Sequence, residues 1–193
     1  VVDLAIPRRR GQARSADDPG ASALLLARAL GLWRGAPLGG APDTEVLAGV
    51  RTRLMEMRNA VVDDLTDARL RLGRHPALAG ELEQLVSEEP LRERRWAQLM
   101  RALYGSGRQA DAMRAFQRAR DVLIDQVGAE PGPELRRLEA AVLAHDDAVL
   151  LRSPGAAQSP IGHGFRRQGN FRHPVSACIG RESEVGSVVA LLA

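Results

Sequence analysis

The sequence predicts an all-α fold, a stack of helix pairs followed by a disordered linker, and three observations support this prediction. Apolar residues recur at steps of three and four along most of residues 21–149, which is the period of an amphipathic helix. A pattern of turns and apolar positions repeats after 34 residues. Aromatic residues make up only 3% of the 193-residue chain, so its core must be mainly aliphatic.

The first part of the chain is predicted to hold one short helix. Residues 1–20 are polar and rich in turn formers, so we expect a loop or approach segment there. Ser22 is then expected to cap the helix. Its apolar face consists of Ala23, Leu26, Ala27 and Leu30. Gly35 and Pro37 follow and break the pattern.

A long amphipathic helix is predicted next, with Asp43 or Thr44 as its N-cap. Its apolar positions are Leu47, Val50, Leu54, Met57, Val61, Leu65, Ala68 and Leu72. Three more helices are expected at about residues 76–87, 90–105 and 109–127. Pro90 is expected to open the second of these, because proline suits the first helical position. After Pro131 and Pro133, a last helix can cap the stack.

The repeated unit has the spacing of a tetratricopeptide repeat. Its signature positions are Trp96, Leu99, Leu103, Gly107, Ala112, Phe116 and Ala119. Gly73 lies 34 residues before Gly107, at the same turn of a weaker preceding copy. The copy has Leu78, Leu82 and Leu85 where the later unit has its last three signature residues. Because such stacks usually bind other macromolecules, the sequence predicts a binding module and no enzyme.

The distribution of charge favours a protein partner over nucleic acid. Residues 43–147 carry 16 Arg against 19 acidic residues, whereas residues 1–42 and 148–193 each have a net charge of +3. Since cationic contacts to phosphate supply most non-specific affinity for nucleic acid, a net acidic helical body is a poor DNA surface. The linker arginines, among them Arg166 and Arg167, could touch DNA in a longer protein or could simply be solvated.

No catalytic, cofactor or metal site is predicted. The four histidines lack a pairing typical of zinc ligands, and the single cysteine, Cys178, excludes an internal disulfide. The acidic pairs at residues 63–64 and 88–89 are interpreted as exposed helix surface or a helix start. Trp33 and Trp96 are interpreted as packing anchors. Without a membrane or secretion signal, we expect a cytoplasmic protein.

Five blocks of sequence, in order, resemble the bacterial transcriptional activation domain of the antibiotic-regulatory-protein (SARP) family of regulators. The blocks are ALGLWRG (29–35), EPLRE (89–93), QLMRALY (98–104), SGRQADA (106–112) and GAEPGPELR (128–136). The resemblance implies that the helical domain, placed at residues 21–149, mediates self-association and contacts with RNA polymerase. It also implies that promoter DNA is bound by an N-terminal winged-helix domain, which this chain lacks.

The C-terminal part resembles the start of a second kind of domain. Residues 150–173 are predicted to be a flexible linker, because they are rich in Gly, Pro and Ser. Gly180, Arg181 and Glu182 then resemble the motif that opens the nucleotide-binding domain of signalling NTPases, which places the beginning of such a domain at residues 174–193. The chain has no lysine for a phosphate-binding loop, so ATP is expected only in a longer native protein.

The sequence therefore predicts a fragment of a transcription activator, since the chain starts with Val and stops inside an apolar run. Two alternatives stay open. One is the sensor or scaffold part of a signalling ATPase, which a phosphate-binding loop beyond Ala193 would favour. The other is a generic repeat scaffold, which the absence of a DNA-binding domain from the native protein would favour. The target promoter, the activating signal and the oligomeric state are not encoded in any pattern that we identify.

Overall fold

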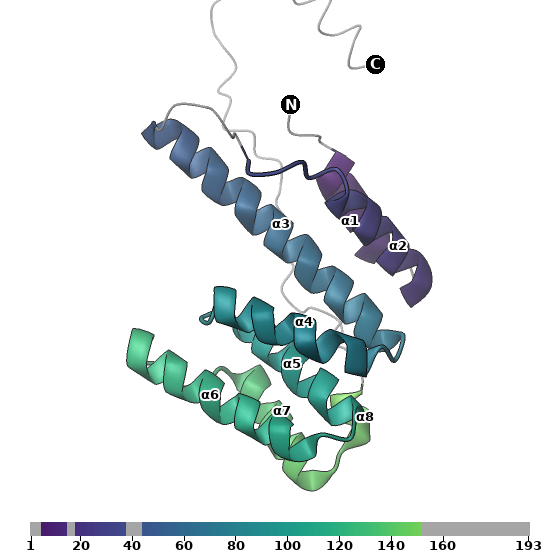
Figure 1. Cartoon of the computed structure of the whole chain (residues 1–193), viewed down its shortest axis with the longest axis vertical. Helices are drawn as coiled ribbons and strands as arrows, with labels where there is room; N and C mark the ends of the chain where they lie inside the picture. Colours follow the sequence, from purple (N-terminus) through teal and green to yellow (C-terminus); the bar gives the residue numbers. More distant parts are fainter. Residues whose placement is uncertain (1–4, 15–17, 38–43, 152–193) are drawn as a thin grey trace, which may run out of the picture. The chain divides into compact units, whose positions relative to one another are not determined.

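The computed structural model describes residues 5–14, 18–37 and 44–151, and every regular element in these ranges is a helix, as predicted (Figure 1). The helices are α1 (Ala5–Arg14), α2 (Pro19–Leu30), α3 (Glu45–Arg71), α4 (His75–Glu88), α5 (Glu93–Gly105), α6 (Gln109–Val127), α7 (Pro133–Ala144) and α8 (Asp147–Leu150). The predicted linker at residues 150–173 falls almost entirely outside the described residues, and the NTPase-like segment at residues 174–193 does so completely.

The prediction of a loop or approach segment over residues 1–20 is wrong for residues 5–14, which form α1 and pack against α2. The reason is tertiary, because this segment has no clear apolar face of its own. Ala13 is buried against residues of α2 and α3, and Arg10 donates a hydrogen bond to Asp64 of α3. Short helices owe most of their stability to such packing, and sequence periodicity does not reveal it.

The predicted cap of the next helix is also wrong, because α2 begins at Pro19 and its N-cap is Asp18. The Asp18 carboxylate accepts hydrogen bonds from the backbone N–H groups of Gly20 and Ala21, at 2.9 and 3.0 Å. Ser22, the predicted cap, is buried inside the helix. Proline at the first helical position and aspartate before it together set the start of α2.

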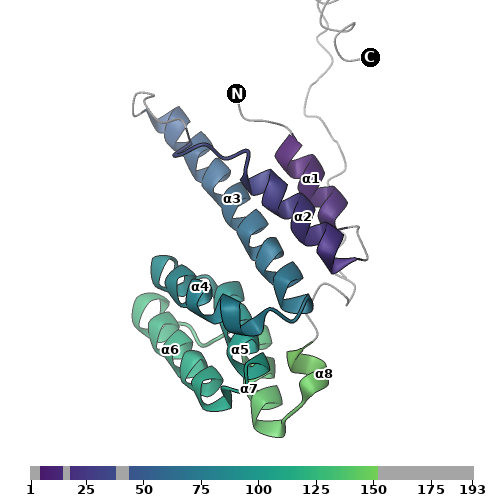
Figure 2. The same cartoon turned by 45° about the vertical axis from the view of Figure 1, so that its right-hand side comes forward.

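The long helix α3 agrees closely with the prediction. Thr44 is its N-cap, and the Thr44 hydroxyl accepts a hydrogen bond from the N–H of Leu47. Figures 1 and 2 show α1 and α2 on one side of α3, and α4 to α8 at its C-terminal end. Helix α3 therefore contributes to two apolar clusters: Val61, Leu65 and Ala68 belong to the cluster with α1 and α2, and Leu70 belongs to the larger cluster of α4 to α8.

The turns that precede α4 and α6 have the same backbone conformation, 34 residues apart. Gly73 and Gly107 have φ angles of +73° and +75°, which glycine adopts readily because it has no Cβ. The next residue in each turn, Arg74 or Arg108, donates its backbone N–H to a carbonyl five residues earlier, Arg69 or Leu103. The period seen in the sequence is thus present in the backbone of both turns.

The prediction that Pro90 opens a helix is wrong. Residues 89–92 form a turn, and α5 starts at Glu93. In this turn the N–H of Arg92 bonds to the carbonyl of Glu89 at 3.1 Å, and the Pro90 carbonyl accepts the indole N–H of Trp96 at 2.8 Å. Proline here serves the turn that anchors Trp96. The C-terminal end also differs from the prediction, because the short helix α8 follows α7 and Asp146 caps it.

Candidate interaction surfaces

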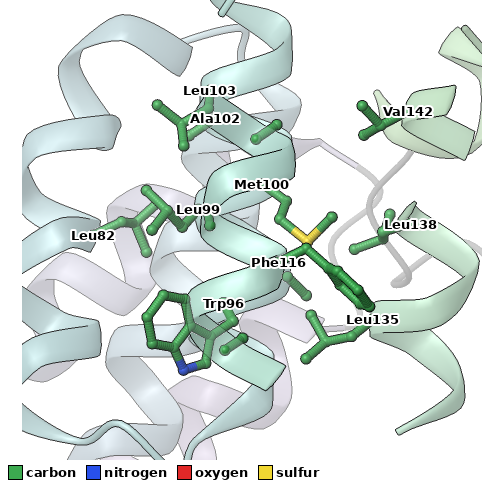
Figure 3. Close-up of a cluster of buried hydrophobic side chains, with 14 of the residues drawn as sticks. Leu82, Trp96, Leu99, Met100, Ala102, Leu103, Phe116, Leu135, Leu138 and Val142 are labelled. Carbon is green, nitrogen blue, oxygen red and sulfur yellow. The ribbon is translucent and has the colours of Figure 1, made fainter. Parts of the chain in front are cut away.

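Helix α5 forms the centre of the larger core. Figure 3 shows Leu82 of α4 on one side of α5, and Leu135, Leu138 and Val142 of α7 on the other. Among the predicted signature residues, Trp96, Leu99 and Leu103 of α5 and Ala112, Phe116 and Ala119 of α6 are all buried, and Gly107 lies in the turn between the two helices. The structure thus brings six of the seven positions into one core, while their assignment to a tetratricopeptide signature stays an interpretation.

The two helix pairs use equivalent positions for similar contacts. Leu78 and Leu82 of α4 are fully buried, like Ala112 and Phe116 at the same positions of α6. His75, the first residue of α4, lies against Gly105 at the end of α5. Gln109, the first residue of α6, donates a hydrogen bond to the carbonyl of Val142 near the end of α7. Each second helix is therefore tied at its start to the end of the helix that follows it.

Trp96 serves as a packing anchor, as its position suggested. Its indole is 4% exposed, and the guanidinium carbon of Arg118 lies 5.4 Å from the ring centroid. Arg118 also forms two hydrogen bonds of 2.9 Å with Glu83, which join α6 to α4. The cation–π contact and the ion pair together fix α6 above α5 and beside α4.

A group of polar residues between α3 and α5, which we call the polar seam, joins the two apolar clusters. Its members are Asn59, Asp63, Asp64 and Asp67 of α3, and Arg94, Arg95 and Gln98 of α5. Arg95 lies at its centre, almost fully buried, and bonds to Asp63 and to Asn59, each at 3.2 Å. Arg94 bonds to Asp64 at 2.6 Å and to Asp67 at 2.5 Å. A buried charge is tolerated only with such partners.

The polar seam corrects the interpretation of both acidic pairs. Asp63 is buried, not on an exposed surface, and Glu89 accepts hydrogen bonds from Asn59 and Arg92. Burial raises the pKa of Asp63, and the neighbouring guanidinium of Arg95 opposes that rise only in part. Burial also acts to raise the pKa of Asp64, but hydrogen bonds from Arg10 and Arg94 outweigh it, so this pKa lies below its ordinary value. No pattern in the sequence pairs residues that lie 32 positions apart.

Two open cavities lie on the described surface. One, of about 420 Å³, lies along α6 beside α4 and is lined by charged residues of both signs, including Glu83, Asp111 and Arg118. Most of these charges are already paired: Arg118 with Glu83, and Arg108 and Arg114 with Asp111. The other, of about 400 Å³, lies between the end of α2 and the middle of α3, and its lining is mainly apolar. Trp33 is part of that lining.

Neither a metal site nor a membrane span is found in the part of the chain that the structure describes. Within residues 5–14, 18–37 and 44–151, His, Cys, Asp and Glu side chains do not gather in a group of three or more that could hold a metal ion. None of the described helices is long and apolar enough to cross a bilayer. The predicted motif of Gly180, Arg181 and Glu182 lies outside these ranges.

Comparison with known proteins decides the family. Residues 2–143 match the family model described as bacterial transcriptional activator domain. The chain belongs to the bacterial transcriptional activator domain family. The match covers α1 to nearly the end of α7, so the helical core and the polar seam are both parts of this domain.

Curated relatives of the bacterial transcriptional activator domain are regulators. Regulatory protein DnrI of Streptomyces peucetius is 39% identical over 132 residues, which are 66% of this chain and 47% of DnrI. Regulatory protein AfsR of Streptomyces coelicolor is 38% identical over 148 residues, which are 77% of this chain and 15% of AfsR. The chain thus spans about half of one relative and a much smaller part of the other.

The fold of the bacterial transcriptional activator domain is also found in a solved structure. Mycobacterium tuberculosis EmbR, in complex with a low-affinity phosphopeptide, matches the chain with a TM-score of 0.70 and 32% identity. The match covers 72% of this chain and 38% of the EmbR chain. EmbR is named a transcriptional regulatory protein, so this relative, like DnrI and AfsR, is a regulator by name and not an enzyme.

Proposed function

We propose that this domain activates transcription through protein contacts, by self-association and by contact with RNA polymerase. The family match over residues 2–143 carries the proposal, and the names of the relatives agree with it. The architecture supports the same conclusion, because α4 to α7 pack as successive antiparallel helices and leave long helix surfaces for partners. Promoter DNA would be bound by a winged-helix domain of a longer native protein, and the site of action would be the cytoplasm.

A domain plan follows from this proposal. We place the activator domain at residues 5–151, extending the sequence-based limits of 21–149 to include α1 and α8. A linker would then continue to residue 173, and residues 174–193 would open a nucleotide-binding domain of a longer protein. The support for that last assignment is the motif of Gly180, Arg181 and Glu182.

A reporter experiment tests activation. Residues 1–193 are fused to an unrelated DNA-binding protein and expressed in a Streptomyces host that carries a reporter gene behind the matching operator. We expect reporter transcripts to rise several-fold over those obtained with the DNA-binding protein alone. A reporter with a mutated operator is the control. No rise at equal protein levels would refute activation by this domain.

Two measurements on the purified 193-residue chain test the remaining parts of the proposal. Sedimentation velocity should show a concentration-dependent dimer or higher oligomer, and a monomer at all concentrations up to about 100 μM would refute self-association. Binding to a fluorescent 20-base-pair duplex at about 150 mM salt should be weak and independent of sequence. Tight, sequence-specific binding would show that the helical domain reads DNA itself.

A further inference from the structure

The apolar cavity between α2 and α3 is built by a segment that contributes little to the main core. Leu30 ends α2, and the following turn brings Trp33 and Pro37 to the cavity, opposite Met55 and Arg58 of α3. The backbone N–H of Trp33 bonds to the Leu30 carbonyl at 2.9 Å, which fixes the turn that carries the indole. Trp33 belongs to the block of residues 29–35 that resembles the regulator family.

This cavity leaves apolar surface open to water. Met55 is 37% exposed, and Trp33 is only partly buried although it packs against the smaller apolar cluster. The volume of about 400 Å³ is enough for two or three large side chains. An apolar depression of this size beside charged groups is typical of a binding site rather than of a surface that packs nothing.

The charges around the cavity have one dominant sign. The described stretches 19–37 and 44–58 contain five arginines, Arg28, Arg34, Arg51, Arg53 and Arg58, against two glutamates, Glu45 and Glu56. Glu56 already forms an ion pair with Arg92 at 2.7 Å. Arg58 lines the cavity, and its guanidinium makes no ion pair with any residue in the described ranges. This basic surface contrasts with the net acidic charge of residues 43–147.

We propose that this cavity docks a short acidic segment of a partner protein, with two large apolar side chains entering between Trp33 and Met55 and a carboxylate bonded to Arg58. The apolar lining favours a peptide over nucleic acid, whose backbone would use the arginines but not the depression. The open mouth of the cavity favours a peptide over a small molecule, which would normally be enclosed. The inference rests on the proposed function only in that both require protein contacts by this domain.

Selection from random peptides tests the proposal and requires no identified partner. A phage library of random 12-residue peptides is selected on the 193-residue chain and counter-selected on the Arg58→Glu variant. We expect enriched peptides to combine at least two large apolar residues with a net negative charge. The best peptide, labelled with fluorescein, should bind Arg58→Glu at least about tenfold more weakly than the unmodified chain in an anisotropy titration.

Matched variants separate local from general effects. Arg137→Glu makes the same charge change at an exposed site of α7, and it should leave the affinity unchanged. Met55→Ala should weaken binding by about three- to tenfold, whereas Leu143→Ala, an exposed apolar truncation on α7, should not. Circular dichroism confirms that each variant is folded. Equal weakening by Arg58→Glu and Arg137→Glu would show non-specific attraction and would overturn the proposal.

Two further outcomes would also overturn it. One is an enrichment of peptides without acidic and apolar character. The other is the absence of selected peptides together with a 20-base-pair duplex that binds tightly and is lost in Arg58→Glu, because the surface would then be for nucleic acid. The reporter fusion keeps the two proposals apart: activation by the unmodified chain without any selected peptide rejects the cavity alone, and peptide binding without activation rejects the proposed function alone.

Discussion

At the residue scale, the contact between Gly105 and His75 shows how closely the helix ends fit. A methyl group at position 105 would lie 2.6 Å from Cγ of the His75 ring, which is too close for any unstrained contact. We therefore expect Gly105→Ala to lower the free energy of unfolding by about 1–3 kcal/mol, because the imidazole and the start of α4 must move. Urea denaturation of the full chain measures this change.

Gly80 provides the matched control, because it lies inside α4 with no other atom within 4 Å of a methyl group at that position. Alanine there should raise the free energy of unfolding by about 0.5–1 kcal/mol, since alanine loses less backbone entropy than glycine in a helix. If both alanine variants were equally stabilised, the ring of His75 would not lie against α5.

Trp96 carries a second prediction at this scale. Its buried indole packs in the core and donates its N–H to Pro90, so Trp96→Ala should cost about 3–5 kcal/mol of unfolding free energy. Trp96→Phe should cost clearly less, since most of the apolar contact is kept and mainly the hydrogen bond is lost. An unchanged melting temperature for Trp96→Ala would contradict both the burial of this residue and the phase of the repeat.

Single residues differ in how far their role could be predicted from sequence. The 34-residue period indicated Gly73 and Gly107, because a turn needs the same residue wherever it recurs. The same reasoning misplaced Pro90, since proline suits both the first turn of a helix and a loop. The burial of Asp63 was missed because it depends on Arg95, and a chain of amino acids read in order does not show which distant charge compensates another.

At the scale of elements, the polar seam determines how α5 lies against α3. Arg95→Met leaves the Asp63 carboxylate buried without its main partner, so we expect a loss of about 3–5 kcal/mol in the free energy of unfolding. In the double variant Asp63→Ala, Arg95→Met no unpaired charge is left. Its loss should be smaller than the sum of the two single losses by at least about 1 kcal/mol, measured by urea denaturation in a double-mutant cycle.

An exposed pair supplies the comparison for that cycle. Arg120 and Glu130 form two hydrogen bonds of 2.9 Å on the surface, and removing both side chains there should show little coupling, because water solvates either charge when its partner is lost. Additive losses at Asp63 and Arg95 would mean that the two side chains are not in contact.

The elements divide in the same way as the residues between those that sequence predicts and those that it does not. Helix α6 has the limits that its apolar period indicated, and α3 starts at a residue that is a good N-cap. Helices α1 and α8 lack such signals: α1 is stabilised by Ala13 and Arg10 against other helices, and α8 has only four residues. The apolar cavity was not predicted either, because the turn after α2 only meets Met55 in three dimensions.

For the described helices as a whole, two apolar clusters share α3, and the link between α1 and α5 passes through Asp64. Its carboxylate bonds to Arg10 of α1 and to Arg94 of α5, both at 2.6 Å. Because these bonds keep the pKa of Asp64 below its ordinary value of 3.8, ionised Asp64 stabilises the folded chain. This stabilisation is complete above the ordinary pKa and is lost as the pH falls through the lower, folded-state pKa. Asp63 acts in the opposite direction, since its pKa is raised.

Comparing the unmodified chain with Asp64→Asn isolates this effect from the general consequences of acid. At pH 7 the variant should unfold at lower urea concentration, and the difference should shrink between about pH 5 and pH 2 as Asp64 becomes protonated in the unmodified chain. Asp111→Asn is the control, because Asp111 also has a lowered pKa, through hydrogen bonds from Arg108 and Arg114, but it is bonded only to its own helix and the preceding turn. Its stability difference should be smaller at pH 7. A pH-independent difference for Asp64→Asn would show that the Asp64 charge does not hold α1 and α5 to α3.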